Sequence, residues 1–163
     1  MTWRTTVLVL LTFGGLAARG SEPVLPSVDA WTTTLLPLTE RGWEPLATSA
    51  SAFVYVSYRD ARREGPIATA SLRKEYRQDQ PWMGYFASRS IVSRVEVDCT
   101  RRTMRDIAST GYADNNLSGE SKSWTAVRPT LWTPVEAGTV ADMAAARICD
   151  WTKKHPIMSN PQP

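Results

Sequence analysis

Alternating apolar and polar positions mark the clearest β-strand of the chain. From Ile91 to Cys99 every second residue is apolar or small, and the positions between them include Arg94, Glu96 and Asp98. A period of two is typical of a strand with one buried and one solvated face. The pattern therefore predicts a strand in which the Cys99 side chain points inward and the two carboxylates lie in solvent.

Other segments have the composition of strands without such clear alternation. Residues 53–58 are β-branched and aromatic, which suits a half-buried pleated surface, and Gly65-Pro66 marks a turn after them. Further strands are expected at 67–76, 103–112 and 121–128. A loop is expected at 78–84, around Pro81. Short strands separated by turn residues predict antiparallel hairpins.

One C-terminal segment has helical periodicity instead. Its apolar stripe consists of Val140, Ala144, Ile148 and Trp151. Thr139 can cap this helix, Asp142 suits its positive end, and Pro156 ends it. Because the stripe must be buried, the sequence predicts an α+β fold: an antiparallel β-sheet with a C-terminal α-helix packed on one face.

The N-terminus has the layout of a secretory signal peptide. Arg4 precedes an almost uncharged apolar stretch from Thr6 to Ala18, which is too short to span a bilayer as a helix. Small residues and a candidate cleavage site after Gly20 follow. We expect residues 1–20 to be removed, leaving an exported protein with no stable membrane span. A buried N-terminal helix and a retained anchor are the alternatives.

Composition then divides the rest of the chain into three parts. Residues 21–42 contain three prolines and a threonine run, and we interpret them as an N-terminal arm or linker whose Trp31 packs at the domain edge. Residues 43–154 are long enough for one α+β domain. Residues 155–163 are expected to form a flexible tail.

Net charge does not indicate a nucleic-acid partner. The whole chain carries a formal charge of +3. Arg4 and Arg19 lie in the expected signal peptide, which has no acidic residue, so the mature chain is closer to neutral. Nucleic-acid binders cluster their basic residues on one face, whereas acidic and basic residues are interleaved here.

The chain contains two cysteines, Cys99 and Cys149. An even number of cysteines in an exported protein is typical of a disulfide. Cys99 points inward from its strand and Cys149 lies beside the apolar stripe of the helix, so a bridge would tether the helix to the sheet. Two buried free thiols are the alternative.

Candidate catalytic chemistry is sparse. His155 is the single histidine and lies in a proline-containing tail, which disfavours a Ser-His-Asp triad and a histidine-rich zinc site. The sequence contains no phosphate-binding loop or dinucleotide fingerprint. We therefore expect no catalytic residues, no metal site and no cofactor, and the residues that bind a partner are not identified by any motif.

Two charged groups keep other functions open. Glu96 and Asp98 could do acid–base chemistry on a glycan, although a solvated sheet face is the simpler interpretation. Arg62-Arg63, Arg101-Arg102 and Arg105 could bind an acidic partner or a glycosaminoglycan, although surface charge balanced by nearby acids is the simpler interpretation.

Three stretches carry a family resemblance. They are FVYVSYRDARREGPIATASLRKEY after Ala52, SIVSRVEVDCTRRTMR from Ser90 to Arg105, and the segment from Trp124 to Cys149 with its Pro129 and Gly138-Thr139. Together they resemble the surface-adhesin protein E-like family of bacterial envelope proteins.

The resemblance implies an antiparallel sheet with a C-terminal helix tethered by a disulfide, in agreement with the residue patterns. It also implies a non-enzymatic protein of the periplasm or cell surface that binds a protein partner. A periplasmic small-ligand sensor, an inhibitor of another protein and a glycan-directed enzyme remain alternatives.

Overall fold

The computed structural model describes residues 25, 27–35, 42–82, 84, 86–126 and 130–156. The expected signal peptide lies outside the described residues, as does most of the expected tail. Two helices are described, α1 (Val28–Leu35) and α2 (Val140–Lys154). No described helix has the length and apolar character needed to cross a membrane.

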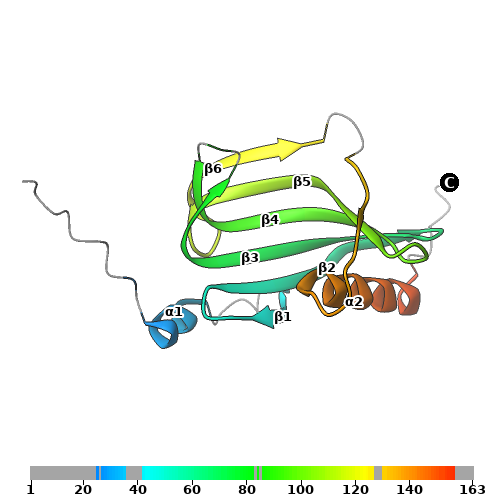
Figure 1. Ribbon diagram of the computed structural model, residues 1–163, viewed down its shortest axis with the longest axis horizontal. Coiled ribbons are helices and arrows are strands. Elements are labelled where there is room, and N and C mark those ends of the chain that lie inside the picture. The colour runs from blue at the N-terminus through cyan, green and yellow to red at the C-terminus, as the bar shows by residue number, and fades with distance from the viewer. Residues whose placement is uncertain are drawn as a thin grey trace, which may run out of the picture.

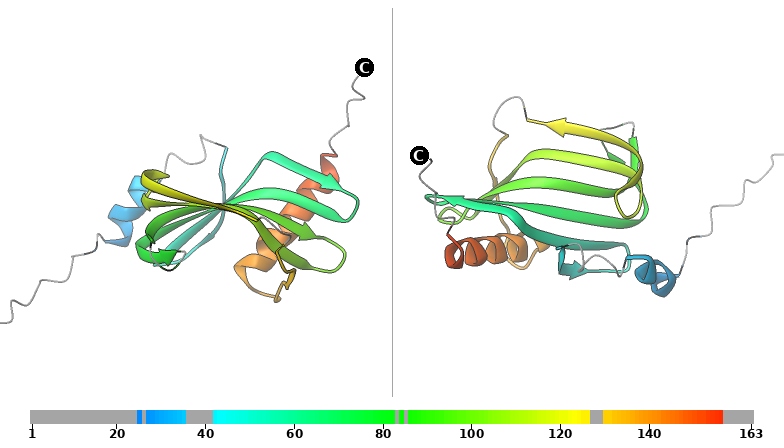
Figure 2. Two further views of the ribbon diagram at one scale, coloured as in Figure 1. Left: turned by 90° about the horizontal axis from the view of Figure 1, so that it is seen from above. Right: turned by 180° about the vertical axis from the view of Figure 1, so that it is seen from behind.

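The strands form one antiparallel sheet (Figure 1). Its members are β1 (Glu44–Thr48), β2 (Ala52–Glu64), β3 (Ile67–Trp82), β4 (Phe86–Asp98), β5 (Thr103–Asp114), β6 (Ser118–Thr125) and β7 (Thr133–Pro134). Strands β1 to β6 follow one another in space as they do in sequence, and β7 pairs with β5. With α2 packed against β1 to β4, this confirms the expected fold class (Figure 2).

Several strands have other bounds than expected. β2 continues to Glu64, through residues expected to lead into the turn after 53–58, and β4 begins at Phe86, before the expected 91–99. β3 continues through Pro81 to Trp82, where a loop is expected. The last residue pair between β2 and β3 is Ala52 with Tyr76. Beyond Tyr76, β3 therefore pairs with β4 on one side and has no β2 residue on the other. Proline is tolerated at such an edge position because its missing N–H removes no ladder bond. β6 also lies three residues earlier than expected, at 118–125 instead of 121–128.

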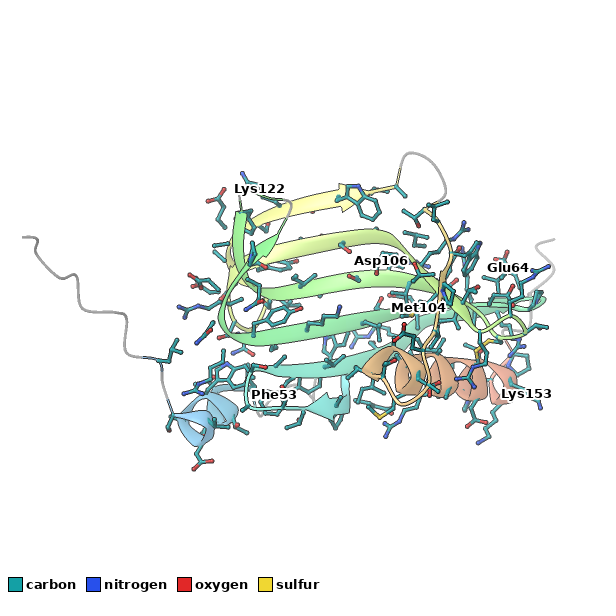
Figure 3. The ribbon with its side chains drawn as sticks, in the orientation of Figure 1. Phe53, Glu64, Met104, Asp106, Lys122 and Lys153 are labelled. Atoms are coloured by element: carbon teal, nitrogen blue, oxygen red, sulfur yellow. A yellow bond between two sulfur atoms is a disulfide. The ribbon has the colours of Figure 1, made fainter. Side chains whose placement is uncertain are left out.

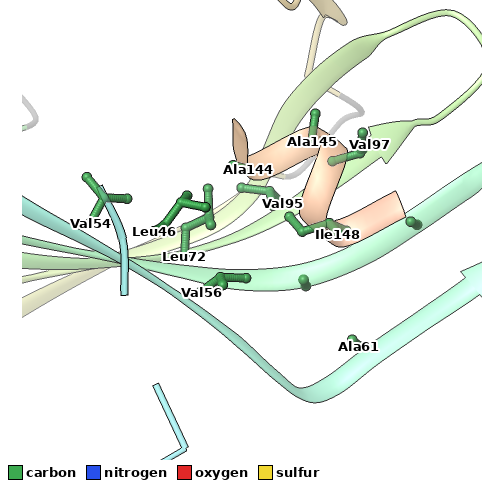
Figure 4. Packing of buried hydrophobic residues seen from close by; sticks show 12 residues of the cluster. Leu46, Val54, Val56, Ala61, Leu72, Val95, Val97, Ala144, Ala145 and Ile148 are labelled. Carbon is green, nitrogen blue, oxygen red and sulfur yellow. The ribbon is translucent and has the colours of Figure 1, made fainter. Parts of the chain in front are cut away.

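Helix α2 begins as its sequence predicts. The Thr139 side chain accepts a hydrogen bond from Asp142 N at 3.2 Å, and the Asp142 carboxylate accepts one from Gly138 N at 3.0 Å. This arrangement is a variant of the capping box, with aspartate in place of glutamate and with the N–H of Gly138 in place of that of Thr139. The main core lies between α2 and the sheet (Figure 4), where Val56, Val97 and Ile148 are completely buried.

The expected disulfide is present between Cys99, which follows β4, and Cys149 of α2. Their Cα atoms are 5.7 Å apart, within the usual range for a bridge. The helix is therefore held on the sheet both by the buried face of the main core and by a covalent bond.

Helix α1 lies within 21–42, where an irregular arm or linker is expected. Its Trp31 and Leu35 are buried against Phe53 and Tyr55 of β2. The neighbouring Val54 belongs instead to the core under α2. Because adjacent residues of a strand point to opposite faces, α1 covers the sheet face opposite to α2.

Candidate functional site

The structure corrects the expectation that Asp98 lies in solvent. Its side chain is buried at the end of β4, with 2% relative exposure for the residue. One carboxylate oxygen accepts hydrogen bonds from Thr100 N and Arg101 N, both at 2.9 Å, and the other lies 3.0 Å from Arg101 Nη1. The backbone hydrogen bond from Arg101 is the main cause that lowers the pKa of Asp98. Asp98 therefore shapes the β4–β5 turn.

Glu96 has a separate partner. One of its oxygens, Oε2, lies 2.8 Å from Arg105 Nε and 2.6 Å from Arg105 Nη2. The Arg105 guanidinium carbon also lies 4.3 Å from the centroid of the Trp132 ring. Since Glu96 and Asp98 are each bound by a different arginine, they do not form the solvated acid–base pair that a glycan-directed enzyme would use.

The arginines that could have bound an acidic ligand have their own partners. Arg62 lies 3.5 Å from Glu64, Arg101 pairs with Asp98, and Arg102 pairs with Asp142. Arg63 donates to the carbonyl oxygens of Gly65 and Cys149, at 3.0 and 3.3 Å. The charges of Arg62, Arg101 and Arg102 are compensated locally, which weakens the case for glycosaminoglycan binding.

A buried ion pair lies on the α1 side of the sheet. Arg73 Nη2 and Glu75 Oε1, both from β3, are 2.5 Å apart, and their side chains are 1% and 0% exposed. Glu75 also accepts hydrogen bonds from Asn115 Nδ2 at 2.8 Å and Asn116 N at 3.1 Å. Desolvation is the main cause that raises the pKa of Glu75, and it outweighs the opposing effects of Arg73 and the two asparagines.

The same asparagines connect this pair to α1. Trp31 Nε1 donates to Asn115 Oδ1 at 3.3 Å, and Asn116 Nδ2 donates to the Thr34 carbonyl oxygen at 2.9 Å. Trp31 also packs edge-on against Phe53, with 4.9 Å between ring centroids. We interpret this network as structural, since it fastens α1 and the β5–β6 turn to the sheet.

A hollow with a volume of about 680 Å³ lies over β5 and β6. Segment 130–135, which follows β6 and crosses toward α2, forms its second wall (Figure 1). Apolar residues from these elements line it: Met104, Trp124, Leu131, Pro134 and Val135. Leu131 at the rim is 90% exposed. We call this hollow the β5–β6 cavity.

Hydrogen bonds hold the crossing segment in place. Val135 N donates to the Arg102 carbonyl oxygen at 2.9 Å, and Thr130 Oγ1 donates to the Asp106 carbonyl oxygen at 2.5 Å. The pairing of β7 with β5 adds a short ladder between Thr103 and Pro134. The second wall is therefore attached to the sheet at both of its ends.

Charge in the β5–β6 cavity comes from Arg105 and Asp106 (Figure 3). The Arg105 cation is neutralised by Glu96 and covered by Trp132. Asp106 is exposed, and its carboxylate forms no ion pair or hydrogen bond within the part of the chain that the structure describes. Within the described residues, the cavity therefore combines an apolar wall with one carboxylate that has no counter-charge.

Sequence patterns did not identify this cavity, because its walls come from segments that are far apart in the chain. The adjacent Leu131 and Trp132 were the available signal, since they are two large apolar residues outside any expected strand or helix. Among the described residues, no group of three or more histidine, cysteine, aspartate or glutamate side chains could hold a metal ion.

The amino-acid sequence was compared with models of known protein families. The profile of the family described as surface-adhesin protein E matches residues 43–150. The chain belongs to the surface-adhesin protein E family. The match runs from just before β1 into α2, so it covers the sheet and the β5–β6 cavity, and it leaves out α1. Family membership makes this an adhesin-like surface protein.

Solved structures agree with the family assignment. Haemophilus influenzae protein E has 13% sequence identity to this chain and a TM-score of 0.52, and the likeness covers 69% of this chain and 87% of that one. A second crystal form of protein E gives 12% identity, a TM-score of 0.53, and coverage of 69% and 90%. At this identity the likeness shows a shared fold. No curated protein matches the chain.

Proposed function

We propose that this chain is an exported, non-enzymatic adhesin-like protein that binds a protein partner at the cell surface or in the periplasm. The observation that carries the proposal is the β5–β6 cavity of a family member, because it offers exposed apolar side chains beside the exposed Asp106 carboxylate, which has no partner among the described residues. Interfaces concentrate binding energy in such apolar centres, while the flanking charges give specificity.

The covalent framework supports an extracytoplasmic location. Disulfides persist in oxidising compartments and are rare in the cytosol of mesophiles, and Cys99 and Cys149 are bridged. The N-terminal residues have the charge and apolar pattern of an export signal. Both features agree with an adhesin-like role outside the cytoplasm.

The arrangement of the candidate acid–base residues supports a non-enzymatic role. A general acid or base must reach the proton that it transfers, in a site that holds the substrate. Asp98 is engaged by three N–H groups of its own turn, and Glu96 is engaged by Arg105. Both carboxylates thus serve the sheet and its turns.

Binding to purified proteins tests the proposal. Biosensor measurements would present the oxidised protein to a panel of extracellular-matrix and plasma proteins and to fractionated envelope proteins. We expect saturable binding to at least one member of the panel. Replacing Trp124 with Ala should weaken that binding about thirtyfold or more, because truncation of an aromatic hot-spot residue at an interface centre costs about 2 kcal/mol or more.

The matched control replaces an aromatic side chain away from the cavity. Tyr58 packs against Trp151 of α2, with 4.8 Å between ring centroids, and it does not line the cavity. Tyr58→Phe should leave partner affinity unchanged. An absence of saturable binding across the whole panel would contradict the proposed function.

A further inference from the structure

The two edges of the sheet differ in how well they are protected. β1 is five residues long, contains Pro45 and has an irregular register between Pro45 and Ala47. The Pro45 carbonyl oxygen also accepts a hydrogen bond from Arg147 Nη1 of α2 at 3.1 Å. Proline, bulges and covering elements are the usual means of blocking strand addition. The β1 edge is therefore closed.

The β6 edge is less protected, since its one register irregularity lies near the start of the strand, between Ser118 and Ser121. β6 runs for eight residues without proline, and all of them are exposed except the half-buried Trp124. It is the last strand of the order β1 to β6, so no described strand pairs with its outer side. Its two charged residues, Glu120 and Lys122, lie 2.8 Å apart and compensate one another.

The register shows which backbone groups of β6 point outward. Ala126 N donates to the Ile107 carbonyl oxygen at 3.0 Å, and the same register continues from the Ala108–Thr125 pair to the Tyr112–Ser121 pair. In an antiparallel pair, residues alternate between bonding to the partner strand and pointing away from it. The N–H and C=O groups of Ser121, Ser123 and Thr125 therefore point away from the sheet.

The open edge borders the β5–β6 cavity. Trp124 of β6 lines that cavity, so a strand added beside β6 would place alternate side chains next to the Trp124 ring. Asp106 lies on β5, one strand further in. Since neighbouring strands are about 4.8 Å apart, the added strand would lie about 10 Å from β5. Among side chains that complement a carboxylate, those of lysine and arginine are long enough to cross that distance.

From these observations we propose that β6 accepts an extended segment of a partner polypeptide as an additional strand, and that a lysine or arginine of this segment reaches Asp106. The inference rests on the proposed function in that the partner is a protein, and it specifies the surface and the chemistry of the bound segment. Main-chain hydrogen bonds would supply affinity, while Trp124 and Asp106 would select the side chains.

A library of random nonapeptides displayed on phage, selected on the full-length oxidised protein, tests this inference. We expect the enriched peptides to carry lysine or arginine more often than the unselected library. Synthetic copies of them should bind Asp106→Asn about tenfold more weakly, which corresponds to the loss of one charge-assisted hydrogen bond. Asp60, an exposed carboxylate of β2, provides the matched control, and Asp60→Asn should bind like the wild type.

A separate substitution tests whether the bound segment forms main-chain hydrogen bonds with β6. Ser121→Pro removes an outward N–H and no bond to β5, so the fold should be kept while peptide affinity falls at least about tenfold. Ser121→Ala keeps the N–H and should bind like the wild type. Bound peptide should also slow amide exchange at Ser121, Ser123 and Thr125 more than at Lys122 and Trp124, whose N–H groups already face β5.

Several results would overturn the inference. Enriched peptides that bind Ser121→Pro as well as Ser121→Ala would exclude strand addition, and unchanged affinity for Asp106→Asn would exclude the basic contact. A library that yields no specific peptide, or an edge that pairs only with a second copy of the chain, would also contradict it. If Ser121→Pro still binds a partner found in the protein panel, the proposed function stands and this inference fails.

Discussion

At the scale of single residues, two buried carboxylates show how local contacts decide the direction of a pKa shift. Asp98 accepts three N–H hydrogen bonds within its own turn, and they lower its pKa despite burial. Glu75 faces an arginine and two asparagines, yet desolvation dominates and raises its pKa. A carboxylate that is bonded by several N–H groups favours its charged form, whereas removal from water disfavours it. The two residues therefore contribute to stability with opposite pH dependence.

For Asp98 the stabilisation is lost on acidification. The pKa of Asp98 is lowered from 3.8, so its contribution is fully present above pH 3.8 and disappears as the pH falls through the folded-state pKa. We expect Asp98→Asn to be less stable than the wild type at neutral pH and to lose less stability below pH 3.8. Urea unfolding at a series of acid pH values measures this. Asp60→Asn, the exposed control, should follow the wild type; equal acid dependence in Asp98→Asn would contradict the prediction.

The contribution of Glu75 to stability depends on pH in the opposite direction. Its pKa is raised above 4.5, so the folded protein binds more protons than the unfolded chain between pH 4.5 and the folded-state pKa. The contribution of Glu75 to stability therefore falls as the pH rises through this interval and stays low above it. Arg73 opposes the effect of burial, because its nearby positive charge lowers the pKa of Glu75.

We expect Arg73→Met to destabilise the protein by about 3–5 kcal/mol at pH 7, because it leaves the Glu75 carboxylate buried without its counter-charge. Replacing both residues, as Arg73→Met with Glu75→Gln, should cost less than Arg73→Met alone. Guanidinium unfolding of the two variants measures the difference. A double variant that is no more stable than the single one would show that Glu75 does not depend on Arg73 for its charge compensation.

At the scale of elements, periodicity predicted those that have one clear apolar face. Alternation of apolar and polar residues predicted β4, and the apolar stripe with its capping residues predicted α2. The same alternation misplaced Asp98 in solvent, because a pattern of two faces does not reveal that a turn folds back over the last residue of a strand. α1 was missed because its burial rests on Trp31 and Leu35, which are too few to form a detectable stripe.

The tether between α2 and the sheet makes a prediction at this scale. Replacing Cys149 with Ser removes the bridge to Cys99 and should cost about 2–5 kcal/mol in the free energy of unfolding. The helix should then open before the sheet, because only its buried face still holds it, and amide exchange should become faster at residues 144–151. Ala146, which is exposed on α2, provides a control. Ala146→Ser should leave exchange unchanged, and a similar rise in both variants would contradict the role of the bridge.

At the scale of the whole molecule, the candidate site depends on how distant segments meet. The β5–β6 cavity combines Met104 and Asp106 of β5, Trp124 of β6, and Leu131 of the crossing segment. The sequence predicted β5 and part of β6 as strands, but apart from the apolar pair Leu131-Trp132 nothing in it indicated that the crossing segment returns over them. Only the structure shows that Glu96 pairs with Arg105 and that Asp106 has no partner among the described residues.

Because many cations are paired with nearby carboxylates, we expect the protein to bind polyanions weakly. The formal charge of +3 would permit binding to heparin if its cations were clustered and free. Several instead lie within 4 Å of carboxylates, among them Arg62 beside Glu64 and Lys154 beside Asp150. At physiological salt the Debye length is about 8 Å, which is longer than the separation within each pair. Beyond that distance each pair therefore attracts a polyanion almost as weakly as a neutral group does. The protein should therefore elute from a heparin column near physiological salt. Glu64→Gln combined with Asp150→Asn should elute at clearly higher salt, because it frees two cations without adding any; elution of the wild type well above physiological salt would show that its cations act together despite their partners.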